Sequence, residues 1–331
     1  MKSIAFFNNK GGVGKTTLLC NVASHLALER DKKILVIDVD PQCNATQLML
    51  DEEDVLAIYD DNKSFTIHSI IHPLSIGKGY SDTIIPRFVA DYGVDLIPGD
   101  PRLALKEDLL SKDWQDAIAG DIRGLRTSVL FSELLGRCSK YDYVLFDMGP
   151  SLGSINRSVL LACDFFLSPM SIDIFSLKAI ENISTSIQEW KRRLAHGVAQ
   201  VDQTLKDDIP GGSSFKIMFA GYVAQQYIQK TTNGEKRAVA AYEAIMKRIP
   251  RSIKSNFIER LQPDQPDINY EIGTIPNLYS LIPMSQSAHK PIFALKAKDG
   301  VRGAHFNKVR DAEKIYKKIS YQLIKNVDEL S

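Results

Sequence analysis

The fold of this chain is decided by one stretch of sequence, Lys10-Gly11-Gly12-Val13-Gly14-Lys15-Thr16-Thr17. The stretch follows a short apolar run, residues 3–8, and precedes residues 16–29, whose apolar side chains recur at helical spacing. It therefore joins a strand to a helix. The glycines let successive backbone N–H groups turn inward around phosphate oxygens, and the helix start adds the positive end of its dipole. We expect this loop to bind a polyphosphate nucleotide.

Two side chains of the loop have the chemistry that such a ligand needs. Lys15 reaches the β- and γ-phosphates, and the Thr16 hydroxyl coordinates magnesium. The ordinary loop of this kind has a glycine five residues before Gly14, whereas this chain has Asn9 there, followed by a second lysine, Lys10. The loop is thus a deviant form of the Walker A motif.

Strand and helix patterns alternate along the rest of the chain. The predicted strands are 34–39, 94–97, 143–146, 165–169 and 216–223, and the predicted helices are 101–110, 125–135, 155–162 and 177–194. This alternation predicts an α/β fold with a doubly wound, mainly parallel sheet flanked by helices, of the P-loop NTPase type.

We expect a single domain over residues 1–331. Residues 51–92 and 195–214 fit the alternation poorly and are interpreted as surface insertions, and residues 251–286 are interpreted as irregular. A last helix, residues 305–330, has an apolar face and is expected to close the core, with binding to a partner or surface as the alternative. The basic segment 290–331 is therefore assigned to the same domain.

Composition narrows the class of protein. The formal net charge is +1, so attraction to nucleic acid must come from a local basic surface. The four cysteines have no metal-binding spacing and are expected to be free thiols, which excludes an iron–sulfur reductase. A leader pattern and a long apolar run are both missing, so we expect a cytoplasmic protein without a membrane partner.

Three motifs in order, KGGVGKTT, VIDVDPQCNAT and YDYVLFDMGPSLG, resemble the ParA family of partition ATPases within the MinD/ParA group. The resemblance implies an ATP- and Mg²⁺-dependent ATPase that forms a homodimer on ATP binding. In this family the lysine at the position of Lys10 contacts the partner's nucleotide, Gly12 lies near the facing subunit and Thr17 lies by the α-phosphate. The implied ATP-binding residues are Lys10, Gly11, Gly12, Val13, Gly14, Lys15, Thr16, Thr17 and Pro283, the last by adenine.

Three aspartates receive roles from the same resemblance. Asp40 orients or activates the attacking water and is the implied catalytic carboxylate beside Lys10 and Lys15. Asp38 lies near the magnesium shell, and Asp147 holds magnesium through water, together with Thr16. From the residues alone, Asp40 is equally well a turn residue at a strand end, and Asp147 a strand-end carboxylate. The family usually has two prolines shortly after the last aspartate, where this chain has Met148-Gly149-Pro150.

Basic clusters near the C-terminus are candidates for phosphate contacts with DNA, since non-specific binding needs an electrostatic surface and no base-reading side chains. The candidate residues are Lys247, Arg248, Arg251, Lys290, Lys296, Lys298 and Arg302. Solvated surface charge explains these clusters equally well. The leading hypothesis is an ATPase that rides nucleoid DNA, is released by a ParB-like stimulating partner and drives plasmid or chromosome partition. The alternatives are a positioning factor for a protein assembly and a nucleotide-gated regulator with little hydrolysis.

Overall fold

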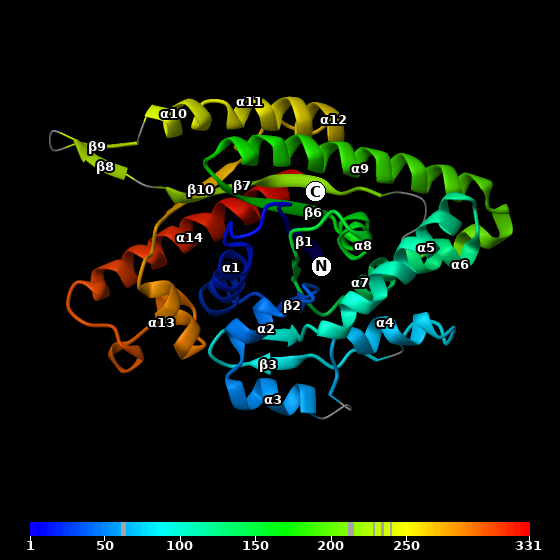
Figure 1. Cartoon of the computed structure of the whole chain (residues 1–331), viewed down its shortest axis with the longest axis horizontal. Coiled ribbons are helices and arrows are strands. Elements are labelled where there is room, and N and C mark those ends of the chain that lie inside the picture. Colours follow the sequence, from blue (N-terminus) through cyan, green and yellow to red (C-terminus); the bar gives the residue numbers. More distant parts are fainter. Residues whose placement is uncertain (61–63, 82, 211–214, 228, 233–234, 239) are drawn as a thin grey trace.

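An eight-stranded sheet forms the centre of the computed structural model, which describes residues 1–60, 64–81, 83–210, 215–227, 229–232, 235–238 and 240–331 (Figure 1). The strand order is β10-β7-β6-β1-β5-β2-β4-β3, and every neighbouring pair is parallel except β3 with β4. The strands are β1 Lys2–Phe6, β2 Ile34–Asp38, β3 Arg87–Val89, β4 Val94–Ile97, β5 Tyr143–Asp147, β6 Phe165–Ser171, β7 Met218–Tyr227 and β10 Glu271–Pro276. A separate antiparallel pair consists of β8 Gln229–Thr232 and β9 Glu235–Ala238.

Helices cover both faces of the sheet, which confirms the predicted doubly wound α/β class. One face carries α1 Lys15–Arg30, α2 Asn44–Met49, α3 Glu52–Asp60, α13 Leu281–Ala288 and α14 His305–Glu329. The other carries α4 Ile67–Ser75, α5 Glu107–Ile118, α6 Ile122–Ser128, α7 Leu130–Gly136, α8 Ser154–Ala162, α9 Ile174–Gln200 and α11 Ile249–Ile253. The remaining helices are α10 Ala240–Met246, α12 Glu259–Leu261, a π-helical turn Lys254–Ile258, and the 3₁₀ turns Pro101–Lys106, Gln203–Asp208, Ile292–Ala294 and Ala297–Asp299.

Alternating side chains of the central strands supply the two cores. Ile4 and Phe6 of β1 pack under α1 and α14, whereas Ala5 packs on the opposite face under α8 and α9. This follows from the pleat of a strand, which turns successive side chains to opposite faces. Strands buried on both faces read as continuous apolar runs, and the inner strands of this sheet do so.

The topology places a ligand site at the end of β1. From β1 the chain moves outward to β2, returns to form β5 between them, and then builds β6 on the other side of β1. The strand order therefore reverses at β1, and open parallel sheets bind ligands beyond the carboxyl ends of the strands at such a reversal.

Several predicted elements are confirmed and others are wrong. The predicted strands coincide with β1, β2, β4, β5, β6 and β7 within a few residues, and the last helix is α14, whose apolar face is buried. Residues 101–110 divide into a 3₁₀ turn and the start of α5, and residues 125–135 divide into α6 and α7. The interpretation of residues 251–286 as irregular is wrong, because they contain β10 and most of α13.

The two predicted insertions have regular structure where the chain is described. Residues 51–92 contain α3, α4 and β3, and residues 195–200 continue α9. Residues 61–63, 82 and 211–214 lie outside the described part. The division into a single domain with insertions stays a prediction. Among the described residues, none of the helices combines the length and the apolar character that a membrane span requires.

Candidate nucleotide-binding site

The phosphate loop between β1 and α1 depends on two glycines in the left-handed region. Gly12 has φ 72° and Gly14 has φ 73°, a conformation that side chains disfavour. Gly14 is also pressed against Gln225 of β7, whose Nε2 donates a hydrogen bond to the Gly14 carbonyl at 3.1 Å. A Cβ on Gly14 would lie 2.4 Å from Gln225 Oε1. The loop is thus anchored to a strand two positions away in the sheet.

Lys15 begins α1 and lies inside the loop. Its side chain is 8% exposed, and its Nζ donates to the backbone carbonyl of Lys10 at 3.4 Å. Burial lowers the pKa of the Lys15 ammonium, while the charges of Asp147 and Asp40 oppose that shift. A phosphate group brought to the loop would supply the negative partner that this buried ammonium lacks at contact distance.

Thr16 and Asp147 form the candidate metal position. The Thr16 hydroxyl donates to Asp147 Oδ2 at 2.8 Å. Asp147, at the end of β5, is completely buried, and its Oδ1 has no hydrogen-bond partner. Burial and the neighbouring Asp38 raise the pKa of the Asp147 carboxyl. A buried carboxylate oxygen without a partner beside a threonine hydroxyl fits a magnesium ion, which favours oxygen ligands and keeps part of its water shell.

Both carboxylate oxygens of Asp38 accept hydrogen bonds from within the protein. It ends β2 directly beside Asp147, the last residue of β5. Its Oδ2 accepts hydrogen bonds from the Thr46 backbone N–H at 2.9 Å and from the Thr46 hydroxyl at 2.7 Å, and its Oδ1 accepts one from the Asp40 N–H at 3.2 Å. Burial raises the pKa of Asp38 to about 7. Because both oxygens already have donors, Asp38 holds α2 against β2.

Asp40 lies at the wall of the phosphate loop and is held by its own segment. Its Oδ1 accepts from the Gln42 N–H at 3.0 Å, and Asn44 Nδ2 approaches Oδ2 at 3.3 Å. Gly149 lies behind this carboxylate, where an added Cβ would be 3.2 Å from Asp40 Oδ1. The position that departs from the family pattern is therefore in contact with the implied catalytic residue, and its lack of a side chain makes room for it.

Lys10 points away from the loop's own phosphate-binding centre in this structure. Its ammonium is ion-paired with Asp173, the residue before α9. The backbone N–H of Lys10 donates to Asn8 Oδ1 at 3.0 Å, and Asn8 Nδ2 donates to the Pro169 carbonyl at 2.8 Å. These bonds tie the entrance of the loop to the end of β6.

A cavity of about 350 Å³ lies over the loop. It is lined by Gly11, Gly12, Gly14, Lys15, Thr16, Thr17, Asp40, Gln42, Asn44, Leu48, Pro150 and Gln286. Six of the predicted loop residues and Asp40 therefore come together at one cavity, whereas Lys10, Asp38 and Asp147 do not line it. Pro283 is exposed on α13 and does not line it, whereas Gln286, one turn later on that helix, does. Val13 turns its side chain into the interior.

Some residues that line the cavity or contact the loop were not among the predicted site residues. Gln42 and Asn44 follow Asp40 in a polar run, which is a signal that could have identified them. Gln225, which is buried against Gly14, and Gln286, which lines the cavity, come from distant segments, and nothing in the local sequence distinguishes them from other glutamines. Asn21 of α1 is another such residue: its Nδ2 donates to the Thr17 carbonyl at 2.8 Å, and its Oδ1 accepts from the Ile292 N–H at 2.8 Å.

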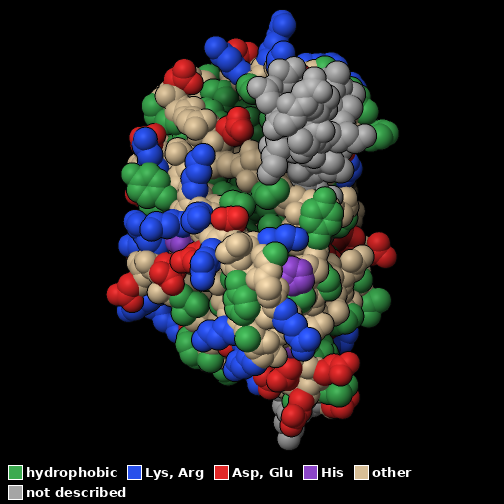
Figure 2. Space-filling model, turned by 90° about the vertical axis from the view of Figure 1, so that its left-hand side faces the viewer, with side chains coloured by type: hydrophobic (Ala, Val, Ile, Leu, Met, Phe, Trp, Pro, Cys, Tyr) green, Lys and Arg blue, Asp and Glu red, His purple; other side chains and the backbone are tan. Residues whose placement is uncertain are grey.

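The basic residues predicted to contact DNA occupy two regions. Lys247, Arg248 and Arg251 are exposed around α11, and Lys296, Lys298 and Arg302 are exposed before α14. Figure 2 views the side on which α13 and the start of α14 lie and shows Lys and Arg side chains spread over it. Lys290 differs, because its side chain is 14% exposed and pairs with Asp299 at 2.7 Å. Its charge is already balanced within the protein. The four cysteines are free and buried, as predicted.

Comparisons with known proteins agree with this geometry. A family model described as an AAA domain matches residues 1–199. A virulence plasmid ParA family protein of Chlamydia psittaci is 32% identical over 184 residues, which span 55% of this chain and 62% of that one, less than two thirds of its length. The chromosome partitioning protein ParA of Myxococcus xanthus is 27% identical over 255 residues, 76% of each chain.

A solved structure agrees with the sequence comparisons. The crystal structure of a Corynebacterium diphtheriae protein superposes with a TM-score of 0.70 at 33% identity, over 87% of this chain and 97% of that one. The deviant phosphate loop, the strand order and these likenesses together show that this chain belongs to the ParA family of partition ATPases, through an AAA domain over residues 1–199.

Proposed function

We propose that this protein is an ATPase switch that dimerises on binding ATP, binds DNA without sequence preference as the dimer, and drives the partition of a plasmid or chromosome. The observation that carries the ATPase part is the bond from Thr16, which lines the cavity with buried Lys15, to Asp147, which is buried beneath it and whose second oxygen has no partner. Family membership supports the partition part.

The residues of the loop bind and position the nucleotide. Backbone N–H groups of residues 11–17 and the Lys15 ammonium take the phosphates, and the Thr16 hydroxyl and, through water, Asp147 hold magnesium. The metal, when bound, neutralises charge on the phosphoryl group and its leaving oxygen. Phosphoryl transfer depends mostly on position and charge neutralisation, so these groups suffice without a covalent nucleophile.

Asp40 is the residue that we assign to the attacking water. Its carboxylate lines the nucleotide cavity and is fixed by the Gln42 N–H and by Asn44, so one oxygen orientation is favoured over others. A carboxylate in this position orients the water by accepting its hydrogen. Lys10 completes the site in the dimer, where it leaves Asp173 and contacts the nucleotide of the other subunit.

DNA binding is assigned to the exposed basic residues around α11 and before α14. Such contacts neutralise phosphates, release counterions and therefore weaken steeply as salt rises. A ParB-like partner that stimulates hydrolysis would end the DNA-bound state. The resulting cycle places the protein in the cytoplasm, on the nucleoid while ATP is bound.

The test is binding to a non-specific DNA duplex with ATP, with ADP and without nucleotide, each at two salt concentrations. Binding that requires ATP and weakens with salt is the expected result. A Lys296→Gln/Lys298→Gln/Arg302→Gln variant should bind DNA more weakly while its ATP-dependent dimer remains. If the protein binds no DNA with ATP, with ADP or without nucleotide, the proposed DNA binding is wrong. The same site would then better support ATP-dependent positioning of a protein assembly.

A further inference from the structure

The outer edge of the sheet at β10 is hollowed on both sides. A cavity of about 550 Å³ lies between β10 and the segment from α11 to α12, and a second, of about 360 Å³, lies between β10 and α14. Both cavities are lined by Asn269 and Glu271, so they meet at the start of the edge strand. Neither shares a lining residue with the nucleotide cavity.

The backbone at this edge has a donor that faces outward. The Tyr270 carbonyl accepts from the Tyr222 N–H of β7 at 2.8 Å and so points into the sheet. In a trans peptide the N–H of the next residue points the opposite way, so the Glu271 N–H faces away from β7. Its partner is the side chain of exposed Asn269, whose Oδ1 accepts it at 3.1 Å. Because the Asn269 side chain is exposed, it can move aside, and the Glu271 N–H can then donate to the backbone carbonyl of an added strand.

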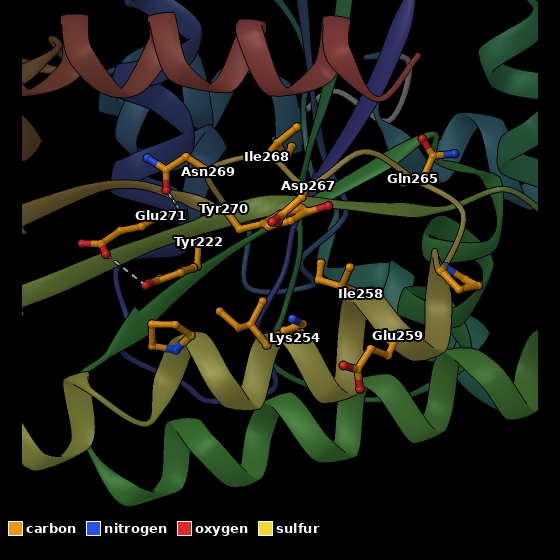
Figure 3. Close-up of a pocket in the computed structure, with 13 residues that line it drawn as sticks. Tyr222, Lys254, Ile258, Glu259, Gln265, Asp267, Ile268, Asn269, Tyr270 and Glu271 are labelled. Atoms are coloured by element: carbon orange, nitrogen blue, oxygen red, sulfur yellow. Dashed lines mark hydrogen bonds between the residues drawn. The ribbon is translucent and has the colours of Figure 1, made fainter.

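The larger cavity is lined by both apolar and acidic side chains, and Figure 3 shows Ile258, Ile268 and Tyr270 around it together with Glu259, Asp267 and Glu271. Ile253 and Tyr270 are buried in its wall, and Ile268 is half-buried. The exposed side chains around the opening include the carboxylates of Glu259, Asp267 and Glu271 and one ammonium, that of Lys254. An anionic ligand would meet net repulsion here, whereas a cationic group attached to an apolar body would match both parts of the lining.

We propose that this edge binds an extended basic segment of a partner protein, which lies along β10 and places a lysine or arginine against Asp267 and Glu271. Successive side chains of an extended chain point to opposite faces. One therefore enters the larger cavity while its neighbour enters the cavity beside α14, where Thr274, Lys318 and Gln322 form a more polar wall. Main-chain bonds to the edge strand would give affinity, and the two cavities would give specificity.

The short and irregular form of this edge would confine an added strand to one end of β10. β10 spans six residues, its pairing with β7 shifts register twice, and it ends at Pro276, which has no N–H. Such features limit uncontrolled pairing between sheet edges. The donor at Glu271 lies before these interruptions, at the end where the two cavities meet, so pairing is confined to a short defined segment.

The experiment selects binders from a library of short random peptides displayed on phage, with the full chain as target and no nucleotide present. The counter-target is an Asp267→Asn/Glu271→Gln variant. The matched control is Glu52→Gln/Glu53→Gln, which removes two exposed carboxylates of α3. Enriched peptides are synthesised with a fluorescein label, and their affinities for the three proteins are measured by anisotropy.

The expected result is enrichment of peptides with a lysine or arginine next to a bulky apolar residue. Their affinity should fall about tenfold on the Asp267→Asn/Glu271→Gln variant and stay unchanged on the α3 control. N-methylation of alternate peptide amides should also weaken binding, because it removes strand pairing. The proposal would be overturned if no peptides were enriched relative to the variant, or if the enriched peptides lacked basic residues. It would also be overturned if the peptides bound all three proteins equally well, or if N-methylation left their affinity unchanged. Because no nucleotide is used, failure here leaves the proposed ATPase cycle untouched.

Discussion

The ammonium of Lys10 is ion-paired within its own chain to Asp173, the residue whose carboxylate also accepts the Ser176 N–H at the start of α9. The side chains are 30% and 34% exposed, and the pairing lowers the pKa of Asp173 although burial opposes that shift. If Lys10 serves the other subunit's nucleotide, this pair must break when the dimer forms. Under the proposed dimerisation, the ion pair would therefore favour the monomer.

Replacing Asp173 by Asn should strengthen ATP-dependent dimerisation. The amide keeps an oxygen for the Ser176 N–H but removes the charge that holds Lys10. An exposed pair contributes about 0.2–1 kcal/mol and each dimer would break two of them, so the dimer dissociation constant should fall by up to about thirtyfold. Sedimentation at a series of protein concentrations with ATP measures it. An unchanged dissociation constant would mean that the ion pair does not stabilise the monomer. Lys10→Ala is the control, because it removes both the ion pair with Asp173 and the proposed contact with the other subunit's nucleotide.

Asp147→Asn should uncouple nucleotide affinity from magnesium. The amide removes the negative charge that would hold the metal but leaves the phosphate contacts of Lys15 and the loop. Calorimetric titration with ADP should show tighter binding on addition of Mg²⁺ for the natural protein and little change for the variant. An equal magnesium effect in both proteins would remove Asp147 from the metal site.

Asp40→Ala should abolish ATP turnover while leaving ATP-bound dimers intact. The side chain lines the nucleotide cavity without contacting the loop lysine, so its loss should spare binding. Phosphate release and sedimentation with ATP measure the two properties on the same sample. A turnover rate equal to that of the natural protein would exclude the assigned role.

Gly149→Ala should slow hydrolysis through Asp40. The added Cβ would lie 3.2 Å from Asp40 Oδ1, so the carboxylate must move by a few tenths of an ångström. Mispositioning of this size can reduce catalysis strongly while ADP affinity is preserved. Gly136→Ala is a suitable control, because a Cβ there has no neighbour within 4 Å. Equal turnover rates for the Gly149 and Gly136 variants would show that this contact is unimportant.

Stability without nucleotide and metal should fall as pH rises from about 4 to 7. Burial raises the pKa of Asp38 to about 7, so the folded protein binds this proton more tightly than the unfolded chain does. Unfolding free energy then declines across that interval, by about 1.4 kcal/mol for each pKa unit of difference, and Asp147 acts in the same direction. Thermal unfolding at several pH values should show a shallower decline for Asp38→Asn, and parallel curves would contradict the assignment.

The sequence allowed the inner sheet and the phosphate loop to be predicted because both depend on local patterns. Short continuous apolar runs such as residues 34–39 and 143–146 indicate strands that are buried on both faces of a sheet. The loop motif is recognised by its fixed spacing of glycines and lysines. The edge strand β10 was missed because its sequence, EIGTIP, contains a glycine and a proline and lacks a continuous apolar run. Edge strands tolerate such residues, so their pattern is weak.

The contacts that shape the candidate site could not be predicted from local pattern. The partners of Lys10 and Gly14, Asp173 and Gln225, are separated from them by 163 and 211 positions in the chain. Only the folded topology brings β6 and β7 beside the loop. Gln286 of α13 lines the cavity, and the assignment of Pro283 on the same helix to adenine stays a prediction.

Asn21 links the loop helix to the last segment of the chain, through the Thr17 carbonyl on one side and the Ile292 N–H on the other. Helix α14 then packs along α1 as part of the same core. During synthesis this segment leaves the ribosome long after β1 and α1, and a domain is completed only as its later elements emerge. Until it emerges, one flank of the phosphate-binding helix stays uncovered, so the candidate nucleotide site is completed well after its loop has been synthesised.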